Sequence, residues 1–448
     1  MAQQYALVAA IVVFTVSSPL LAGARPQSAR LTNRIMGAVT LESQMYGFFE
    51  LLQQAKFTEA TKDFTPAMKT ALPASQLQTV WQGLIQEFGT LKSTQILRTE
   101  TGPGNRVVSV KLEFQKGNQN LRMVFDRQQQ IAGLAVAPPD YQAPAYVRPT
   151  SFLEREMQIG TGKSALPATF TLPVGKGAFP VVVLVHGSGP QDRDESMGPN
   201  KPFRDLAWGL ASQGIAVLRY DKRTKVYPQS FGGTFTVKEE TVDDAIVAVT
   251  QLRQVKEINP RKIFVLGHSL GGMMIPRIGK LDPTIAGLIV LAGNTRPFED
   301  LLLEQTAYLI SLDGSVSPEE TAYLEALKRS VAKVRSPQLS QAKPAELLLG
   351  IPASYWLDLQ GYYPPAVAKT LKQPLLILQG ERDYQVTLAD FQGWKTGLSG
   401  KQNVTFKTYT KLNHLFMPGE VKSNPEEYQV PGHVAKAVID DIAAWIKS

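Results

Sequence analysis

The chain contains no cysteine and only four histidines among its 448 residues. The lack of cysteine excludes disulfides, thiolate metal sites, a cysteine nucleophile and lipidation of an N-terminal cysteine. The scarcity of histidine argues against a histidine-rich metal site, and we expect neither a metal nor an organic cofactor. A catalytic base of this type has to be one of the following histidines: His186, His268, His414 and His433.

A concentrated basic segment is also absent. The formal net charge is +8, yet no run of five or more Lys or Arg residues occurs. Proteins that bind nucleic acid usually gather Lys and Arg in a patch, so we expect no nucleic-acid partner. Hydrophobic residues make up 44% of the chain and charged residues 19%, which is a globular composition. The length suffices for two or three domains.

The first 24 residues carry no charged side chain. An apolar stretch from Tyr5 to Val16 is followed by Ser, Pro and small residues that end at Ala24. This pattern is typical of a secretory signal peptide, residues 1–24, although the usual basic start is missing. The alternative is an uncleaved membrane anchor, but the apolar stretch is shorter than the roughly 20 residues of a span. We therefore expect export to the periplasm or the exterior.

Residues 35–137 combine two kinds of periodicity. Apolar residues recur at helical spacing in two segments, 41–52 and 77–88, and the period then becomes two in residues 107–114 and 121–125. Helices followed by antiparallel strands predict a small α+β domain. A Pro-rich linker, residues 138–150, follows it. No catalytic cluster stands out, so a folding or spacing role is the simpler interpretation, with binding or dimerisation as the alternative.

Strands and helices alternate in residues 151–448. Val181 to Val185 is a continuous apolar run, as a strand buried on both faces requires. Two strand-like pieces precede it, and later strand-like segments alternate with helical ones: "IAVLRYDKR", "RKIFVLGHS", "IAGLIVLAGN", "QPLLILQGERD" and "VTFKTYTKLNH". This alternation predicts an α/β domain with a mostly parallel, doubly wound sheet.

The segment "FVLGHSLGGMM" places Ser269 between a predicted strand and a predicted helix. Gly267 and Gly271 allow a tight turn past which neighbouring chain can run closely. The pattern G-x-S-x-G is only moderately specific by itself, because small residues often flank such turns for packing. Here it lies downstream of a His-Gly turn and upstream of an acid and a histidine that each follow a strand. This context indicates that Ser269 is a nucleophile.

A serine hydroxyl needs a base that accepts its proton and a third group that orients the base. His414, which follows the strand "VTFKTYTK", is the favoured base. His268 adjoins the serine, but neighbouring side chains at an elbow diverge. His433 is expected to open the terminal helix, and His186 belongs to the turn "HGSG".

The acid is expected in "LQGERDYQVT", just after an apolar strand. The candidates are Asp383 and Glu381, although Glu381 at the strand end tends to be held in the turn. The N–H groups that meet the developing oxyanion are expected from Leu270, the residue after the nucleophile, and from Ser188, with Gly189 as the alternative. The charged residues Asp192, Arg193 and Asp194, together with "RYDKR" (Arg219 to Arg223), favour a charged network that braces the site floor over direct substrate contact.

Together, "HGSGPQDRDE", "RYDKR", "GHSLGG", "GERDYQV" and "LNHLF" resemble one branch of the bacterial α/β-hydrolases. This branch contains esterases and relatives labelled serine aminopeptidase-like or dienelactone-hydrolase-like, and some members carry a small α+β domain in front. The resemblance covers about residues 150–448 and identifies Gly267, His268 and Gly271 as parts of the nucleophile elbow. It also implies the triad order Ser, acid, His, which places the acid at Asp383 and the base at His414. The glycine that usually follows "YDKR" is Thr224 here.

About eighty residues separate the strand-like segment that ends at Asn294 from the one that starts at Pro374, which is too many for a simple connection. Within them, Ser317 with Glu320 forms a predicted capping box that starts a helix. We expect a helical cap, residues 297–368, over Ser269.

Within this cap, Tyr355 and Trp356, with Tyr362 and Tyr363 close by, either line an acyl pocket or form the core of the cap. The sequence does not separate these two interpretations.

These patterns predict an exported serine hydrolase that cleaves a small-molecule carboxylic ester through an acyl-enzyme. A peptidase of the same fold is the runner-up, and a secreted binding protein with a vestigial site is the alternative from another class. An aminopeptidase would need an acid to hold the substrate ammonium. The candidates Glu299, Asp300 and Glu304 flank Leu301 to Leu303, whose apolar face favours an uncharged acyl chain.

Overall fold

The structure is a computed structural model that describes residues 41–102, 104–137 and 141–448. The chain divides into two compact units, Met1–Asp140 and Tyr141–Ser448. The predicted signal peptide, residues 1–24, lies outside the described residues. In the part of the chain that the structure describes, none of the helices has the length and apolar character needed to cross a bilayer.

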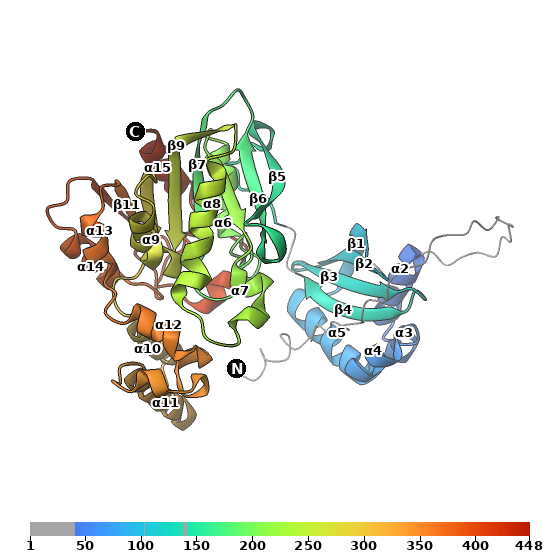
Figure 1. Ribbon diagram of the computed structural model, residues 1–448. Helices are drawn as coiled ribbons and strands as arrows, with labels where there is room; N and C mark the ends of the chain where they lie inside the picture. Colours follow the sequence, from blue (N-terminus) through green and yellow to red (C-terminus); the bar gives the residue numbers. More distant parts are fainter. Residues whose placement is uncertain (1–40, 103, 138–140) are drawn as a thin grey trace. The chain divides into compact units, whose positions relative to one another are not determined.

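The N-terminal unit is an antiparallel sheet in the order β1-β2-β3-β4, with helices packed on it (Figure 1). Its elements are α2 (Leu41–Gln53), α3 (Phe57–Ala60), α4 (Pro66–Ala71), α5 (Ala74–Phe88), β1 (Leu91–Thr101), β2 (Asn105–Phe114), β3 (Asn118–Asp126) and β4 (Ile131–Ala137). The predicted small α+β domain is confirmed. Sequence analysis did not predict strand β1, because most of its residues are polar. Its pairing with β2 is also shifted in register twice, which interrupts the alternation of apolar and polar residues expected in a strand.

The C-terminal unit contains a larger sheet in the order β12-β11-β10-β9-β7-β8-β6-β5. Its strands are β5 (Phe152–Ile159), β6 (Leu166–Pro173), β7 (Phe179–Val185), β8 (Ala216–Tyr220), β9 (Ile258–His268), β10 (Gly287–Leu291), β11 (Leu375–Gly380) and β12 (Val404–Tyr409). Pairs that involve β6 are antiparallel and the others are parallel. The predicted mostly parallel sheet is confirmed.

Helices cover both faces of this sheet, and β7 shows why. Val181, Val183 and Val185 join one core cluster, whereas Val182 and Leu184 join the other. The first cluster includes residues of α8 (Asp243–Leu252), α9 (Leu270–Leu281) and α14 (Leu388–Gly397), and the second includes residues of α6 (Pro202–Ala211) and α15 (Lys436–Lys447). A strand buried on both faces needs apolar residues at every position, as the sequence of β7 has.

A helical cap lies between β10 and β11. It consists of α10 (Phe298–Ile310), α11 (Pro318–Val334), α12 (Ala353–Leu359) and α13 (Pro364–Thr370) with short 3₁₀ turns between them. The predicted capping box is present: the N–H of Glu320 donates to Ser317 Oγ at 3.1 Å, and the N–H of Ser317 donates to Glu320 Oε2 at 2.8 Å. Helices α10, α11 and α12, orange in Figure 1, gather at one end of the sheet.

Residues 141–150, predicted as part of the linker, lie against the C-terminal unit. The hydroxyl of Tyr141 donates to Asp205, and the hydroxyl of Tyr146 donates to the carbonyl oxygen of Val434 at 2.8 Å. The compact unit therefore begins about ten residues earlier than the composition of the linker indicates.

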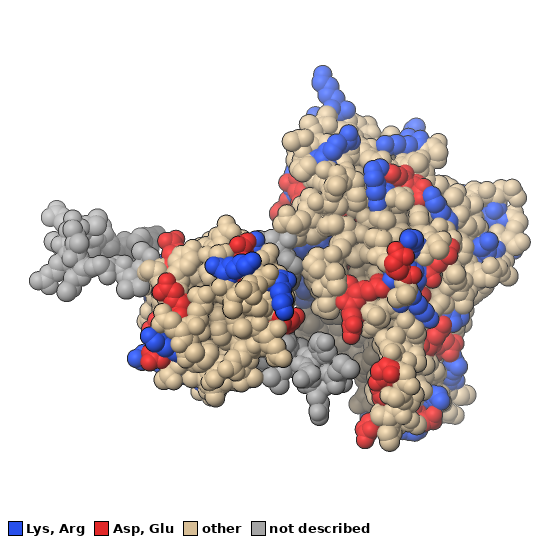
Figure 2. Space-filling view, turned by 180° about the vertical axis from the view of Figure 1, so that it is seen from behind, with Lys and Arg blue, Asp and Glu red and all other residues tan. Residues whose placement is uncertain are grey.

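Charged side chains are mixed over the surface. On the face shown in Figure 2, Lys and Arg alternate with Asp and Glu, and many lie in neighbouring pairs of opposite sign. On this face the two signs of charge are thus interspersed.

Candidate active site

Ser269 lies between the end of β9 and the start of α9, with φ 53° and ψ −119°. This is a sparsely populated backbone conformation for a residue with a side chain, and it costs about 1–3 kcal/mol. The surrounding chain holds it in place: the N–H of Ser269 donates to the carbonyl oxygen of Leu291, and its own carbonyl accepts from the N–H of Met273, both at 2.9 Å. Such a turn presents the serine hydroxyl at the end of the sheet.

The glycines of this elbow serve close approach. Gly267 and Gly271 do not have a positive φ; Ser269 does. A Cβ atom on Gly271 would collide with the carbonyl oxygens of Val185 and His186, and one on Gly267 would collide with the carbonyl of Gly271. The first turn of α9 therefore rests directly against the backbone of its neighbours.

His414 and Asp383 meet at the carboxyl ends of the last two strands. Nδ1 of His414 is 2.6 Å from Oδ2 of Asp383, and both side chains are buried. The other carboxylate oxygen of Asp383 accepts the N–H groups of Gln385 at 2.7 Å and Val386 at 3.0 Å. An ionised carboxylate only accepts, so Nδ1 of His414 donates and Nε2 remains available as a base.

The alternative acid and base candidates lie elsewhere. Glu381 is exposed and accepts from the hydroxyl of Thr408 at 2.7 Å. His433 lies just before α15, with Nδ1 3.1 Å from Oδ1 of Asp205. Each is thus engaged away from the pair formed by Asp383 and His414.

His268 brings His414 beside the elbow. Its ring centroid is 4.5 Å from that of His414, and its Nε2 is 2.9 Å from the carbonyl oxygen of His414. A carbonyl oxygen only accepts, so Nε2 of His268 carries the hydrogen. Because His268 directly precedes Ser269, this contact places the loop of His414 next to the candidate nucleophile. Sequence analysis expected the side chains of His268 and Ser269 to diverge. It did not predict that His268 would support the backbone of the loop that carries His414.

Glu195, which sequence analysis did not single out, completes a buried pair with His268. Nδ1 of His268 is 2.9 Å from Oε2 of Glu195. Burial lowers the pKa of His268, but the Glu195 carboxylate outweighs this effect and the pKa is raised. Burial likewise raises the pKa of Glu195, but the His268 contact outweighs it and the pKa is lowered. Both shifts favour the ionised pair.

The turn after β7 approaches the serine through Gly187. A Cβ atom on Gly187 would lie 3.2 Å from Cβ of Ser269, so a larger residue would crowd the nucleophile. Ser188 and Gly189 follow, and Gly189 has a φ of 83°. On the other side, Leu270 starts α9, and the first N–H groups of a helix have no acceptor within it. The turn at Gly187 and the start of α9, next to which the predicted oxyanion donors lie in sequence, thus both adjoin Ser269.

Residues 178–421 match the family described as "Serine aminopeptidase, S33" and residues 47–134 match "Protein of unknown function (DUF3887)". Esterase EstD of Thermotoga maritima is 38% identical over 412 residues, which is 90% of this chain and 95% of that protein. The chain belongs to the serine aminopeptidase S33 family of α/β-hydrolases.

Two solved structures also resemble this hydrolase. Est1E of Butyrivibrio proteoclasticus is 16% identical, with a TM-score of 0.42 over 65% of this chain and 99% of its own. The acylaminoacyl peptidase of Pyrococcus horikoshii is 14% identical, with a TM-score of 0.45 over 79% of this chain and 56% of its own.

The predicted charged network contacts the turn at Gly187 through Lys222. Arg193 pairs with Asp221 at 3.0 Å, and Asp194 pairs with the buried Arg219. Partners that sequence analysis left unassigned complete it: Glu156 with Arg193, Glu240 with Lys222, and Asp244 with Arg223. These side chains thus form a network of ion pairs with one another.

The aromatic residues of the cap have different surroundings. Trp356 lines a pocket of about 460 Å³ together with Thr295, Leu359 and Tyr362. Tyr355 does not line it; its hydroxyl donates to Oε2 of Glu240 at 2.7 Å. Burial, together with the charge of Glu240, raises the pKa of Tyr355 well above its usual value, so the hydroxyl stays protonated. Tyr355 thus belongs to the core of the hydrolase.

Helix α10 of the cap is bound to the loops that carry Asp383 and His414. The side-chain amide of Gln305 donates to the carbonyl of Gln385, and the hydroxyl of Tyr308 donates to the carbonyl of Ser423, both at 2.9 Å. The rings of Tyr308 and Tyr384 stack with centroids 5.1 Å apart. In contrast, the buried residues of α11 are Val331 and Val334, both near its C-terminus.

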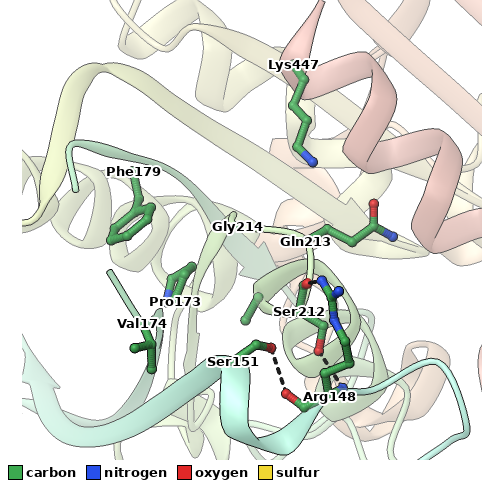
Figure 3. A pocket seen from close by; sticks show the side chains of 10 residues that line it. Arg148, Ser151, Pro173, Val174, Phe179, Ser212, Gln213, Gly214 and Lys447 are labelled. Atoms are coloured by element: carbon green, nitrogen blue, oxygen red, sulfur yellow. Dashed lines mark hydrogen bonds between the residues drawn. The ribbon is translucent and has the colours of Figure 1, made fainter. Parts of the chain in front are cut away.

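Another pocket of about 410 Å³ lies far from this chemistry. Figure 3 shows Phe179, which begins β7, and Gly214, which precedes β8, among its lining residues. These are the amino ends of parallel strands, whereas Ser269, Asp383 and His414 follow carboxyl ends. Ligands of open α/β sheets bind at the carboxyl ends, so we assign this pocket no part in catalysis.

Within the described ranges, no group of three or more His, Asp or Glu side chains is arranged to hold a metal ion.

Proposed function

We propose that the hydrolase cleaves carboxylic esters through an acyl-enzyme on Ser269, with His414 as base and Asp383 as the carboxylate that orients it. The observation that carries this proposal is the 2.6 Å contact between His414 and Asp383, held beside the elbow serine by His268. The relative that is 38% identical is named an esterase.

In this mechanism, Oγ of Ser269 attacks the ester carbonyl while Nε2 of His414 takes its proton. Asp383 stabilises the resulting imidazolium. The negative charge on the carbonyl oxygen is met by the N–H groups of Leu270 and of Ser188, with Gly189 as the alternative to Ser188. His414 then protonates the leaving alcohol, and water hydrolyses the acyl-enzyme by the same steps in reverse order.

The acids of the cap favour esters over amino-terminal peptides. Glu299 lies 3.4 Å from Nε of Arg335, which also pairs with Asp300. Glu304 pairs with Arg296 at 2.5 Å. Each of the three carboxylates thus already pairs with an arginine, which would compete with a substrate ammonium. Leu301, between them in sequence, is buried in the core.

Substitution of Ser269 by alanine tests the nucleophile. We expect Ser269→Ala to remove nearly all hydrolysis of p-nitrophenyl butyrate and all labelling by a fluorophosphonate probe, because no other residue carries the acyl group. Labelling of both proteins to the same extent would show that a different residue is the nucleophile.

A substrate panel tests the preference for esters. An alkoxide leaves a tetrahedral intermediate more readily than an amine, which has to be protonated first. Short or medium p-nitrophenyl esters should therefore be cleaved much faster than p-nitroanilides of free amino acids. Comparable kcat/KM values for the anilides, lost on substitution of Glu299, Asp300 or Glu304, would favour the peptidase.

We also propose that the protein is exported. The support is the uncharged apolar stretch of residues 1–24. Protein from an exporting host should begin near Arg25 by mass analysis, and a folded protein that begins at Met1 or Ala2 would contradict cleavage.

A further inference from the structure

Two buried charged side chains hold the backbone on both sides of Gly187. Its N–H donates to Oε1 of Glu195 at 2.6 Å, and its carbonyl oxygen accepts from Nζ of Lys222 at 2.7 Å. The side chain of Lys222 is 2% exposed. Burying an ammonium group is costly even when it is paired, as Lys222 is with Glu240, so its additional bond to a single loop carbonyl requires a reason.

The direction of the next N–H supplies that reason. In a planar trans peptide, the carbonyl of one residue and the N–H of the next point in opposite directions. The hydrogen bond from Lys222 to the carbonyl of Gly187 therefore fixes the direction of the N–H of Ser188. We propose that Lys222 is a positioning residue that keeps this N–H aimed at the oxyanion on Ser269. The inference rests on the proposed ester hydrolysis and deepens it.

Without such a restraint, this peptide would be free to turn. Glycine tolerates backbone conformations that other residues avoid, and here Gly187 is followed by Ser188 and then by Gly189. A larger residue at 187 would stiffen the turn but would crowd Ser269. The hydrolase thus needs a flexible residue for close approach and a separate group that removes the flexibility.

Lys222 is itself held rigidly. Its ammonium lies 2.6 Å from Oε1 of Glu240, and its backbone N–H donates to the carbonyl oxygen of Gln191 at 3.0 Å. The second oxygen of Glu240 accepts the hydroxyl of Tyr355. Glu240 lies on a π-helical turn, Lys238–Val242, and such turns recur at functional sites.

Glu195 holds the preceding peptide in the same way. Its second carboxylate oxygen binds His268, which donates to the carbonyl of His414. The turn that carries Ser188 and the loop that carries His414 are thus connected through buried hydrogen bonds and the ion pair between Glu195 and His268. Glu195 thus fixes the peptide before Gly187, whereas Lys222 fixes the peptide after it, to which the Ser188 N–H belongs.

The substitution Lys222→Met tests the proposal, because it removes the ammonium and keeps the length of the side chain. We expect kcat for p-nitrophenyl butyrate to fall about 100-fold, as for loss of one oxyanion donor, with KM changed less than about threefold. Affinity for a trifluoromethyl ketone, which forms a tetrahedral oxyanion on the serine, should fall by a similar factor. Lys238→Met, at an exposed lysine of the π-helical turn, is the matched control and should leave both values within about twofold.

A second variant covers the case in which Lys222→Met does not fold. Glu240→Gln keeps the volume and weakens the hold on Lys222, so kcat and ketone affinity should fall together by about tenfold. If either folded variant loses thermal stability but binds the trifluoromethyl ketone as tightly as the wild type, the role of Lys222 is structural and the proposal is wrong. Failure of the proposed function is seen separately, as ester hydrolysis that survives Ser269→Ala.

Discussion

Asp383 and Glu381 are two residues apart, yet their surroundings differ sharply. Asp383 is buried and accepts from His414 and from two backbone N–H groups, whereas Glu381 is exposed. We expect Asp383→Asn to lower kcat by about 10⁴, because an amide no longer fixes the required tautomer of His414. Glu381→Gln is the control and should cost less than about twofold. Equal losses in the two variants would leave the orienting acid unassigned.

His186 makes the stability of the hydrolase depend on pH. Burial lowers its pKa to about 4, although the nearby Glu195 opposes this. The unfolded chain binds a proton on this residue near pH 6.5, so between these pH values the folded state carries fewer protons and stability falls as the pH falls. From pH 7 to pH 5 the loss is about 2 kcal/mol.

Urea unfolding at these two pH values measures this contribution. His186→Gln removes the titration, so its free energy of unfolding should fall by about 2 kcal/mol less than that of the wild type over the same range. An identical pH dependence in both proteins would show that His186 does not titrate in this way.

The sequence predicted some of the site residues and missed others for a physical reason. Ser269, Asp383 and His414 each follow a strand, and the carboxyl ends of parallel strands share one edge of a sheet. Glu195 and Glu240 do not directly follow a strand, and Lys222, which follows β8, is predicted from the sequence only as a member of the charged network. Charged residues in loops are usually solvated, and only the folded chain shows that these three are buried and paired.

At the scale of elements, the same change in two helices should have opposite effects. A Cβ atom on Gly271 in α9 would collide with backbone oxygens, whereas one on Gly47 in α2 would meet nothing within 4 Å. Gly271→Ala should therefore destabilise the protein by about 3 kcal/mol or more. Gly47→Ala should stabilise it by about 0.5–1 kcal/mol, since alanine is the better helix former. Thermal unfolding of both variants decides this, and a stable Gly271→Ala protein would refute close packing at the elbow.

The start of the C-terminal unit was harder to predict than its helices and strands. Helix α2 and strand β7 stand out because every face they bury is marked by apolar residues. Residues 141–150 are rich in Pro and look like a linker, yet Tyr141 and Tyr146 bind the C-terminal unit through single hydroxyl groups. A pair of specific hydrogen bonds leaves no periodic signal in a sequence.

At the scale of the whole molecule, the proposed catalytic residues and their supports all come from the C-terminal unit. We expect a fragment of residues 141–448 to hydrolyse p-nitrophenyl butyrate with kcat/KM within about threefold of the full chain. A fragment of residues 151–448 loses the contacts of Tyr141 and Tyr146 and should unfold at a lower temperature. Loss of activity in the longer fragment would mean that the N-terminal unit contributes to the site.

The fastening of α10 to the loops of Asp383 and His414 has a consequence for motion. Helix α10 cannot swing outward unless the contacts of Gln305 and Tyr308 break, so any opening of the cap has to hinge beyond its C-terminal end. The first turns of α11 bury no side chain and are the natural moving part. In hydrogen exchange, amides of α10 should be protected nearly as long as those of β11, while the first half of α11 exchanges sooner. Substrate would then enter past a mobile α11, and the acid and the base would keep their places throughout each opening.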